Sequence, residues 1–146
     1  MRIILVLFFF LIWSGKLFSQ DLAGEWRGTF TDDRDFFYTG ISTEIRLYFS
    51  KVNDSTYQAF SVSYLKDKKI KDSAICILIG VFLEKDILFL EETRAIKYFH
   101  GEDSNTCLQS MKLNFYKRKK KLFLTGNWYS KIDDCGYGPI SLIKKL

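Results

Sequence analysis

Short runs in which apolar and polar residues alternate follow one another along this chain of 146 residues. Such a period of two predicts β-strands with one buried face. In the clearest run, Ile45, Leu47 and Phe49 share one face, while charged residues and a tyrosine share the other. No stretch has the period of a convincing amphipathic helix. The alternation therefore predicts an all-β fold.

Eight strands are predicted, most of them bounded by charged, polar or glycine-containing turns. They cover residues 24–30, 43–50, 57–64, 74–83, 87–93, 111–117, 122–128 and 139–145. The fourth is so rich in isoleucine that we expect it to be covered on both sides. Eight such strands are most economically closed into a single antiparallel up-and-down barrel, which removes the exposed edges. Residues 94–109 show no clear period, and no sequence signal fixes the strand order.

The first twenty residues have the composition of a secretory signal peptide. Arg2 precedes an uncharged apolar run that ends at Trp13, and this run is too short to cross a bilayer as a helix. We therefore predict a signal peptide over residues 1–20 and one barrel domain over residues 21–146. The mature protein is expected to be secreted or periplasmic, with no membrane span.

The charge balance of the mature domain is mild. The full chain carries 22 Lys and Arg against 17 Asp and Glu, and two of the cations, Arg2 and Lys16, belong to the leader. A nucleic-acid-binding domain has a more concentrated basic face, so nucleic acid is not expected as a partner. The one dense basic run, Lys117–Lys121, would either discourage edge pairing at a solvated hairpin tip or contact an anionic surface.

The chain has three cysteines, and export would permit a disulfide between two of them. Residues 111–117 and 122–128 predict a hairpin, and Cys107 and Cys135 flank its open side. We predict a structural disulfide between these two cysteines. Cys76 lies in an apolar strand, where a buried inert thiol is expected in preference to a reactive one.

The sequence contains no recognisable catalytic or metal-binding pattern. His100 is the only histidine, and one ligand does not make a metal site. The acidic pairs Glu91-Glu92 and Asp133-Asp134 are neighbours in sequence, so on a strand the two members would point to opposite faces. We expect no enzymatic activity, no metal and no cofactor. A hydrolase would require carboxylates that converge only in three dimensions.

Aromatic side chains are the candidates for a ligand site. They are Trp26, Phe36, Phe37, Tyr38 and Trp128. The two tryptophans would either line a pocket or fill the core. The other three rings fall in a predicted loop, where they would form a lid over the barrel mouth, form a contact surface, or pack against the barrel wall.

The step Gly24–Trp26 at the entry of the first strand resembles the Gly-x-Trp motif of lipocalins and related calycin barrels, including avidin-like ones. In those families the tryptophan plugs one end of the barrel and packs against a basic side chain from a late strand. The resemblance implies that Trp26 is the plug and that Lys144 or Lys145 covers it. The chain ends at its last predicted strand, without the C-terminal helix of typical lipocalins. Its tail, residues 126–142, resembles small exported proteins of Bacteroidota.

Together these features favour an exported, non-enzymatic, lipocalin-like barrel that binds or carries a small apolar ligand. The alternative is a solid barrel that acts as an interaction or inhibitor module. It would contact a protein or an anionic surface through its loops and its basic turn. We expect a monomer in either case. An open apolar interior would favour the carrier, and a filled interior would favour the interaction module.

Overall fold

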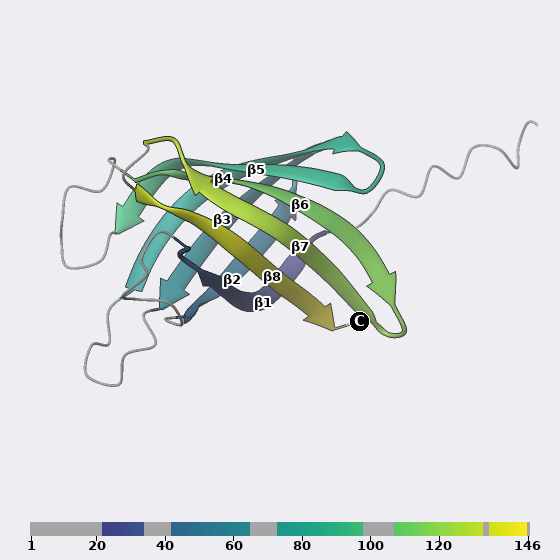
Figure 1. The fold of residues 1–146 in the computed structure, drawn as a ribbon. Coiled ribbons are helices and arrows are strands. Elements are labelled where there is room, and N and C mark those ends of the chain that lie inside the picture. The colour runs from purple at the N-terminus through teal and green to yellow at the C-terminus, as the bar shows by residue number, and fades with distance from the viewer. Residues whose placement is uncertain (1–21, 34–41, 65–72, 98–106, 133–134, 146) are drawn as a thin grey trace, which may run out of the picture.

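A computed structural model of the chain confirms a closed barrel of eight antiparallel strands (Figure 1). It describes residues 22–33, 42–64, 73–97, 107–132 and 135–145. The strands are β1 (Gly24–Thr31), β2 (Ser42–Lys51), β3 (Thr56–Tyr64), β4 (Ser73–Glu84), β5 (Ile87–Lys97), β6 (Gln109–Arg118), β7 (Lys121–Ser130) and β8 (Tyr137–Lys145). Each strand pairs with its neighbour in sequence, and β8 pairs with β1 to close the sheet.

The connections distinguish the two ends of the barrel. At the end where β1 begins, here called the Trp26 end, short turns join β2 to β3, β4 to β5, and β6 to β7. At the opposite end, here called the loop end, the strands are separated by longer stretches. These are residues 32–41, 65–72, 98–108 and 131–136. Figure 1 shows the strand ends that flank these stretches gathered on one side of the barrel.

The core lies inside the barrel, and aliphatic side chains make up most of it. The buried aliphatic side chains include Leu22, Ile45, Leu47, Leu78, Leu88, Leu90, Met111, Leu113, Leu124 and Leu142. The apolar face predicted for β2 is therefore the inner face. In β3 the more apolar face points outward, since Phe60 is 45% exposed while Ser61 and Ser63 are buried.

The prediction that β4 is covered on both sides is wrong, because Ile79 on its outer face is 47% exposed. The outer faces of β2 to β5 instead form an apolar groove of about 470 Å³. The residues that line it are Tyr48, Ser50, Gln58, Ala59, Phe60, Ile75, Ile77 and Ile96. The isoleucines of β4 thus belong to an apolar outer surface rather than to a second core.

Strand β5 continues to Lys97, beyond its predicted end. Its pairing with β4 skips Thr93 and Ile96, which have no residue opposite them. Each skipped residue is a β-bulge, which makes two successive side chains face outward and cancels the alternation. This explains why the sequence shows no period there.

The Gly-x-Trp step has a backbone requirement. Gly24 has a φ of 107°, a left-handed conformation that side-chain-bearing residues rarely adopt. The indole Nε1 of Trp26 donates a hydrogen bond to the carbonyl of Leu22 at 2.8 Å. The Lys144 ammonium reaches the same place from β8 and donates to the carbonyl of Ala23. One of the two lysines suggested by the lipocalin resemblance therefore lies beside this step.

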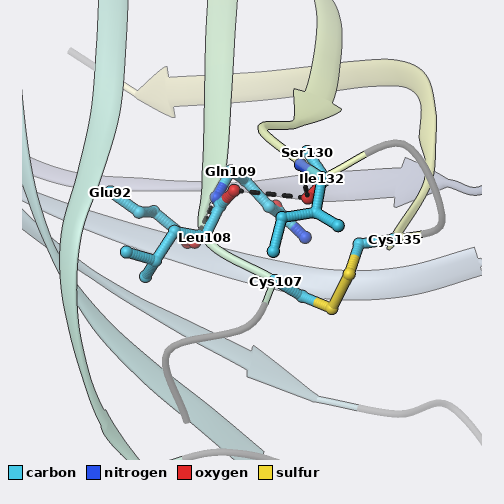
Figure 2. Close-up of a disulfide and its surroundings, with 7 residues drawn as sticks. All are labelled: Glu92, Cys107, Leu108, Gln109, Ser130, Ile132 and Cys135. Carbon is cyan, nitrogen blue, oxygen red and sulfur yellow. Dashed lines mark hydrogen bonds between the residues drawn. A yellow bond between two sulfur atoms is a disulfide. The ribbon is translucent and has the colours of Figure 1, made fainter.

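The predicted disulfide is present: Cys107 and Cys135 are bonded, with Cα atoms 5.5 Å apart (Figure 2). The β6–β7 ladder ends with Gln109 opposite Ser130, so both cysteines lie just beyond it. Hydrogen bonds also cross this region, including one of 2.9 Å from the Ser130 amide to the Gly136 carbonyl. The disulfide therefore ties the start of β6 to the start of β8 at the loop end.

Candidate functional site

Five aromatic side chains fill the interior at the Trp26 end. They are Trp26, Phe49, Tyr57, Phe82 and Phe115. Each ring meets the next edge to face at a centroid distance of 6.1 to 6.4 Å, and the last contacts the first, so the five form a closed circuit. Such pairs add about 0.5–1.5 kcal/mol each beyond area burial. This aromatic cluster leaves the Trp26 end packed with side chains.

Toward the loop end, the inner positions of β2 to β5 carry short side chains instead. These are Thr43, Ser61, Ser63, Ala74, Cys76 and Ala95, all buried. On the opposite wall, Phe30 of β1 and Trp128 of β7 pack edge to face with ring centroids 5.3 Å apart. The inner lining therefore changes from large rings to short side chains along the barrel axis.

A carboxylate side chain points into this region. Glu92 of β5 is 4% exposed, and among the described residues it is the only Asp, Glu, Lys or Arg that is buried. Its Oε2 accepts a hydrogen bond from the backbone N–H of Gln109 at 2.9 Å, which Figure 2 shows. Its Oε1 accepts one from the Ser61 hydroxyl at 3.5 Å. Burial raises the pKa of Glu92 to about 7, an effect that these hydrogen bonds only partly offset.

Cys76 of β4 completes this polar group. It pairs with Ser61 on β3, and its thiol hydrogen-bonds to Glu92. Burial and the neighbouring carboxylate raise the pKa of Cys76 to about 12. A thiol with so high a pKa is protonated at neutral pH and is a poor nucleophile, as expected for a buried inert cysteine.

The backbone around Glu92 explains its position. The β5–β6 ladder ends with Glu91 opposite Ser110, immediately before Glu92. The bulge at Thr93 follows, with its hydroxyl donating to the carbonyl of Ile77 at 3.2 Å. The Glu92 carboxylate therefore accepts the Gln109 N–H at the point where β5 and β6 separate.

Glu92 is not among the site residues predicted from the sequence, although Glu91 and Glu92 were predicted to point to opposite faces. That prediction is confirmed: Glu91 pairs with Lys131 on the outer face. The missed signal is the step of two from the inner residues Leu88 and Leu90, which leads directly to Glu92.

The predicted site residues are placed as follows. Trp26 lies in the aromatic cluster and Trp128 lies near the loop end, so the structure does not bring them together. Trp128 is 2% exposed and donates its indole N–H to the Thr31 carbonyl at 2.8 Å. The other three predicted site residues, Phe36, Phe37 and Tyr38, lie outside the described residues. So do the predicted signal peptide, His100 and Asp133-Asp134.

Within the described ranges, no group of three or more His, Cys, Asp or Glu side chains is placed to hold a metal ion. In the same part of the chain, no helix has the length and apolar character needed to cross a membrane.

A second charged feature lies at the Trp26 end. The five cations from Lys117 to Lys121 are all exposed around the β6–β7 turn. Strand β8 ends beside them, with Lys145 opposite Lys121. We call residues 117–121, together with Lys144 near the end of β8, the basic corner. It lies at the opposite end of the barrel from the polar group around Glu92.

The barrel is similar in fold to solved structures of other small β-barrels. The redesigned β-barrel mFAP1, bound to DFHBI, matches with a TM-score of 0.61 at 12% identity, over 87% of this chain and 97% of that one. EF1p2_mFAP2b, also bound to DFHBI, matches with a TM-score of 0.56 at 10% identity, over 85% and 92%. No family model and no curated protein matches the sequence.

Proposed function

We propose that this protein is an exported, non-enzymatic, lipocalin-like barrel that binds a small apolar ligand in the loop-end half of its interior. The observation that carries the proposal is the change of inner lining along the barrel axis. Rings pack the Trp26 end, whereas short side chains line four neighbouring strands toward the loop end. An eight-stranded barrel is just wide enough to be filled by its own side chains or to hold one small ligand. Short inner side chains favour the ligand.

Two further observations support the proposal. Two barrels of similar fold were solved with the small molecule DFHBI bound. The Cys107–Cys135 disulfide is typical of exported proteins, because cytosolic thiols are usually kept reduced. In this proposal Phe30 and Trp128 offer the ligand an apolar wall, and the aromatic cluster closes the far end.

The test is the binding of a neutral fluorescent probe, N-phenyl-1-naphthylamine, to the purified mature protein. We expect saturable binding, which Ser63→Leu abolishes because the larger side chain fills the inner region. Val62→Leu is the matched control, since this neighbouring side chain points away from the interior. Absence of binding to the wild type would overturn the proposal. Equal binding to both variants would place the probe elsewhere, for instance in the outer groove, and would also overturn it.

The basic corner favours a second function, contact with an anionic surface. Its cations are concentrated on one end of the barrel, and beside them Tyr116 and Phe123 stack on the outer face with ring centroids 5.0 Å apart. Concentrated positive charge attracts anionic surfaces, and neighbouring aromatic rings suit a lipid–water interface. Because this surface is at the Trp26 end, it could be used without covering the loop end.

A further inference from the structure

The surroundings of Glu92 indicate which chemical class of ligand the barrel binds. This inference rests on the proposed function, the binding of a small ligand inside the barrel. Both carboxylate oxygens face hydrogen-bond donors. One donor is the backbone N–H of Gln109, which can only donate, and the other is the Ser61 hydroxyl. The Cys76 thiol is the third polar neighbour. Donors around both oxygens favour the ionised carboxylate over the neutral acid.

Among the described residues, the surroundings nevertheless lack a positive charge. Within the described ranges no basic side chain pairs with Glu92, although the preceding residue, Glu91, pairs with Lys131 outside the barrel. Arg94 is the nearest cation on the same strand, and the bulge leaves it exposed on the outer face. A buried carboxylate without a counter-charge is unfavourable, which is why burial is the largest influence on the pKa of Glu92.

A purely structural role does not require this charge. The Gln109 amide needs only an acceptor, which a glutamine at position 92 would provide without burying an ionisable group. The charge has a purpose if a cation from outside the chain completes the site.

We propose that the ligand is an amphipathic amine, with an ammonium group on a small apolar body, and that Glu92 is its counter-ion. The two carboxylate oxygens offer about four lone-pair positions, and the Gln109 backbone N–H, the Ser61 hydroxyl and the Cys76 thiol use three of them, so the carboxylate can accept another hydrogen bond. The ammonium donates to this remaining position and to the hydroxyls beside it. The apolar body extends toward Phe30 and Trp128 on the opposite wall.

The test compares two compounds that share one apolar body, 2-phenylethylamine and 2-phenylethanol. Both are titrated against N-phenyl-1-naphthylamine bound to the wild type and to Glu92→Gln, at about pH 8, where Glu92 is ionised. We expect the amine to bind the wild type at least about tenfold more tightly than the alcohol, because its hydrogen bonds to Glu92 are charge-assisted. In Glu92→Gln this advantage disappears, because the amine loses its charge-assisted hydrogen bonds to the carboxylate.

The outcomes separate the two proposals. If the alcohol binds the wild type as tightly as the amine, or if neither displaces the probe, the amine inference fails and the carrier remains. If the neutral probe itself does not bind, the proposed function fails and the inference fails with it. The comparison of the two compounds on the wild type does not depend on whether Glu92→Gln folds. If that variant folds and keeps the preference for the amine, Glu92 is not the counter-ion.

Discussion

At the scale of single residues, Glu91 and Glu92 show how strongly position in the barrel controls chemistry. The two side chains are identical and adjacent, yet one pairs with Lys131 on the surface and the other is buried among Ser61, Cys76 and the Gln109 amide. The alternation of the strand alone separates them. A single step along β5 therefore turns a surface ion pair into a buried carboxylate with a raised pKa.

The stability of the protein is expected to depend on pH through Glu92. Its pKa in the folded state is raised from 4.5 to about 7, so between these values the folded state binds more protons than the unfolded state. Folding stability attributable to Glu92 therefore falls as pH rises through this window, by about 3 kcal/mol in total. Glu92→Gln does not titrate and should lack this loss.

Urea unfolding of both proteins from about pH 4 to about pH 8 measures the difference. The free energy of unfolding of Glu92→Gln should increase relative to that of the wild type as pH rises. Glu91→Gln is the matched control, because the Glu91 side chain is 40% exposed, and its stability relative to the wild type should show no comparable drift. Parallel pH curves for Glu92→Gln and the wild type would contradict the prediction.

At the scale of strands, the pairing register determines which face of a strand points into the barrel where the period of two leaves this open. The alternation of β2 identified its inner face, whereas β3 carries apolar residues on both faces. Ser61 points inward because its partners across the ladders, Leu47 and Cys76, do so. In β5 the bulges at Thr93 and Ile96 cancel the period, so its end could not be recognised from the sequence.

Only those parts of the site that depend on local strand pairing could be predicted from the sequence. The disulfide was predictable because the register of one local hairpin brings Cys107 and Cys135 together. The burial of Glu92 depends on β3 and β6, and Ser61 lies 31 positions away in sequence. Trp128 was selected as an aromatic residue, and the pairing of strands then placed it opposite the short side chains.

Removing the disulfide is expected to lower stability substantially. Cys107 and Cys135 are 28 positions apart, and closing a loop of that length contributes about 3–4 kcal/mol in the chain-entropy model. Urea unfolding of the Cys107→Ser, Cys135→Ser double variant measures the loss. Reduction should destabilise the wild type and Cys76→Ala alike, because Cys76 is not in the bond. A double variant that still responds to reduction would contradict this assignment.

The aromatic cluster gives a further prediction. Phe49→Ala removes a buried ring that packs against Trp26 and Tyr57, and should cost about 3–5 kcal/mol of unfolding free energy. Phe60→Ala makes the same chemical change on the outer face, where the ring is 45% exposed and stacks on Tyr48. It should cost about 1 kcal/mol. Chemical denaturation compares them, and equal losses would show that the cluster adds no special stability.

At the scale of the whole molecule, the two ends of the barrel are suited to different tasks. The Trp26 end is packed inside, its strands are joined by short turns, and the basic corner lies on one side of it. The loop end has short inner side chains, the buried carboxylate and the longer connections. A barrel attached to a surface by its basic corner would therefore direct its loop end away from that surface.

This separation makes a prediction that tests the surface contact independently of the ligand. Lys119→Glu with Lys120→Glu reverses two cations at the exposed turn, each of which contributes about 1 kcal/mol near an anionic membrane. Binding to vesicles that contain anionic lipid should therefore weaken at least about thirtyfold in a cosedimentation assay, and added salt should weaken the binding of the wild type similarly.

Arg94→Glu with Lys97→Glu makes the same charge change at the loop end and should bind like the wild type. If both double variants lose binding equally, attraction depends on net charge and not on the basic corner. If the turn variant alone loses binding and still takes up N-phenyl-1-naphthylamine, the two ends act independently.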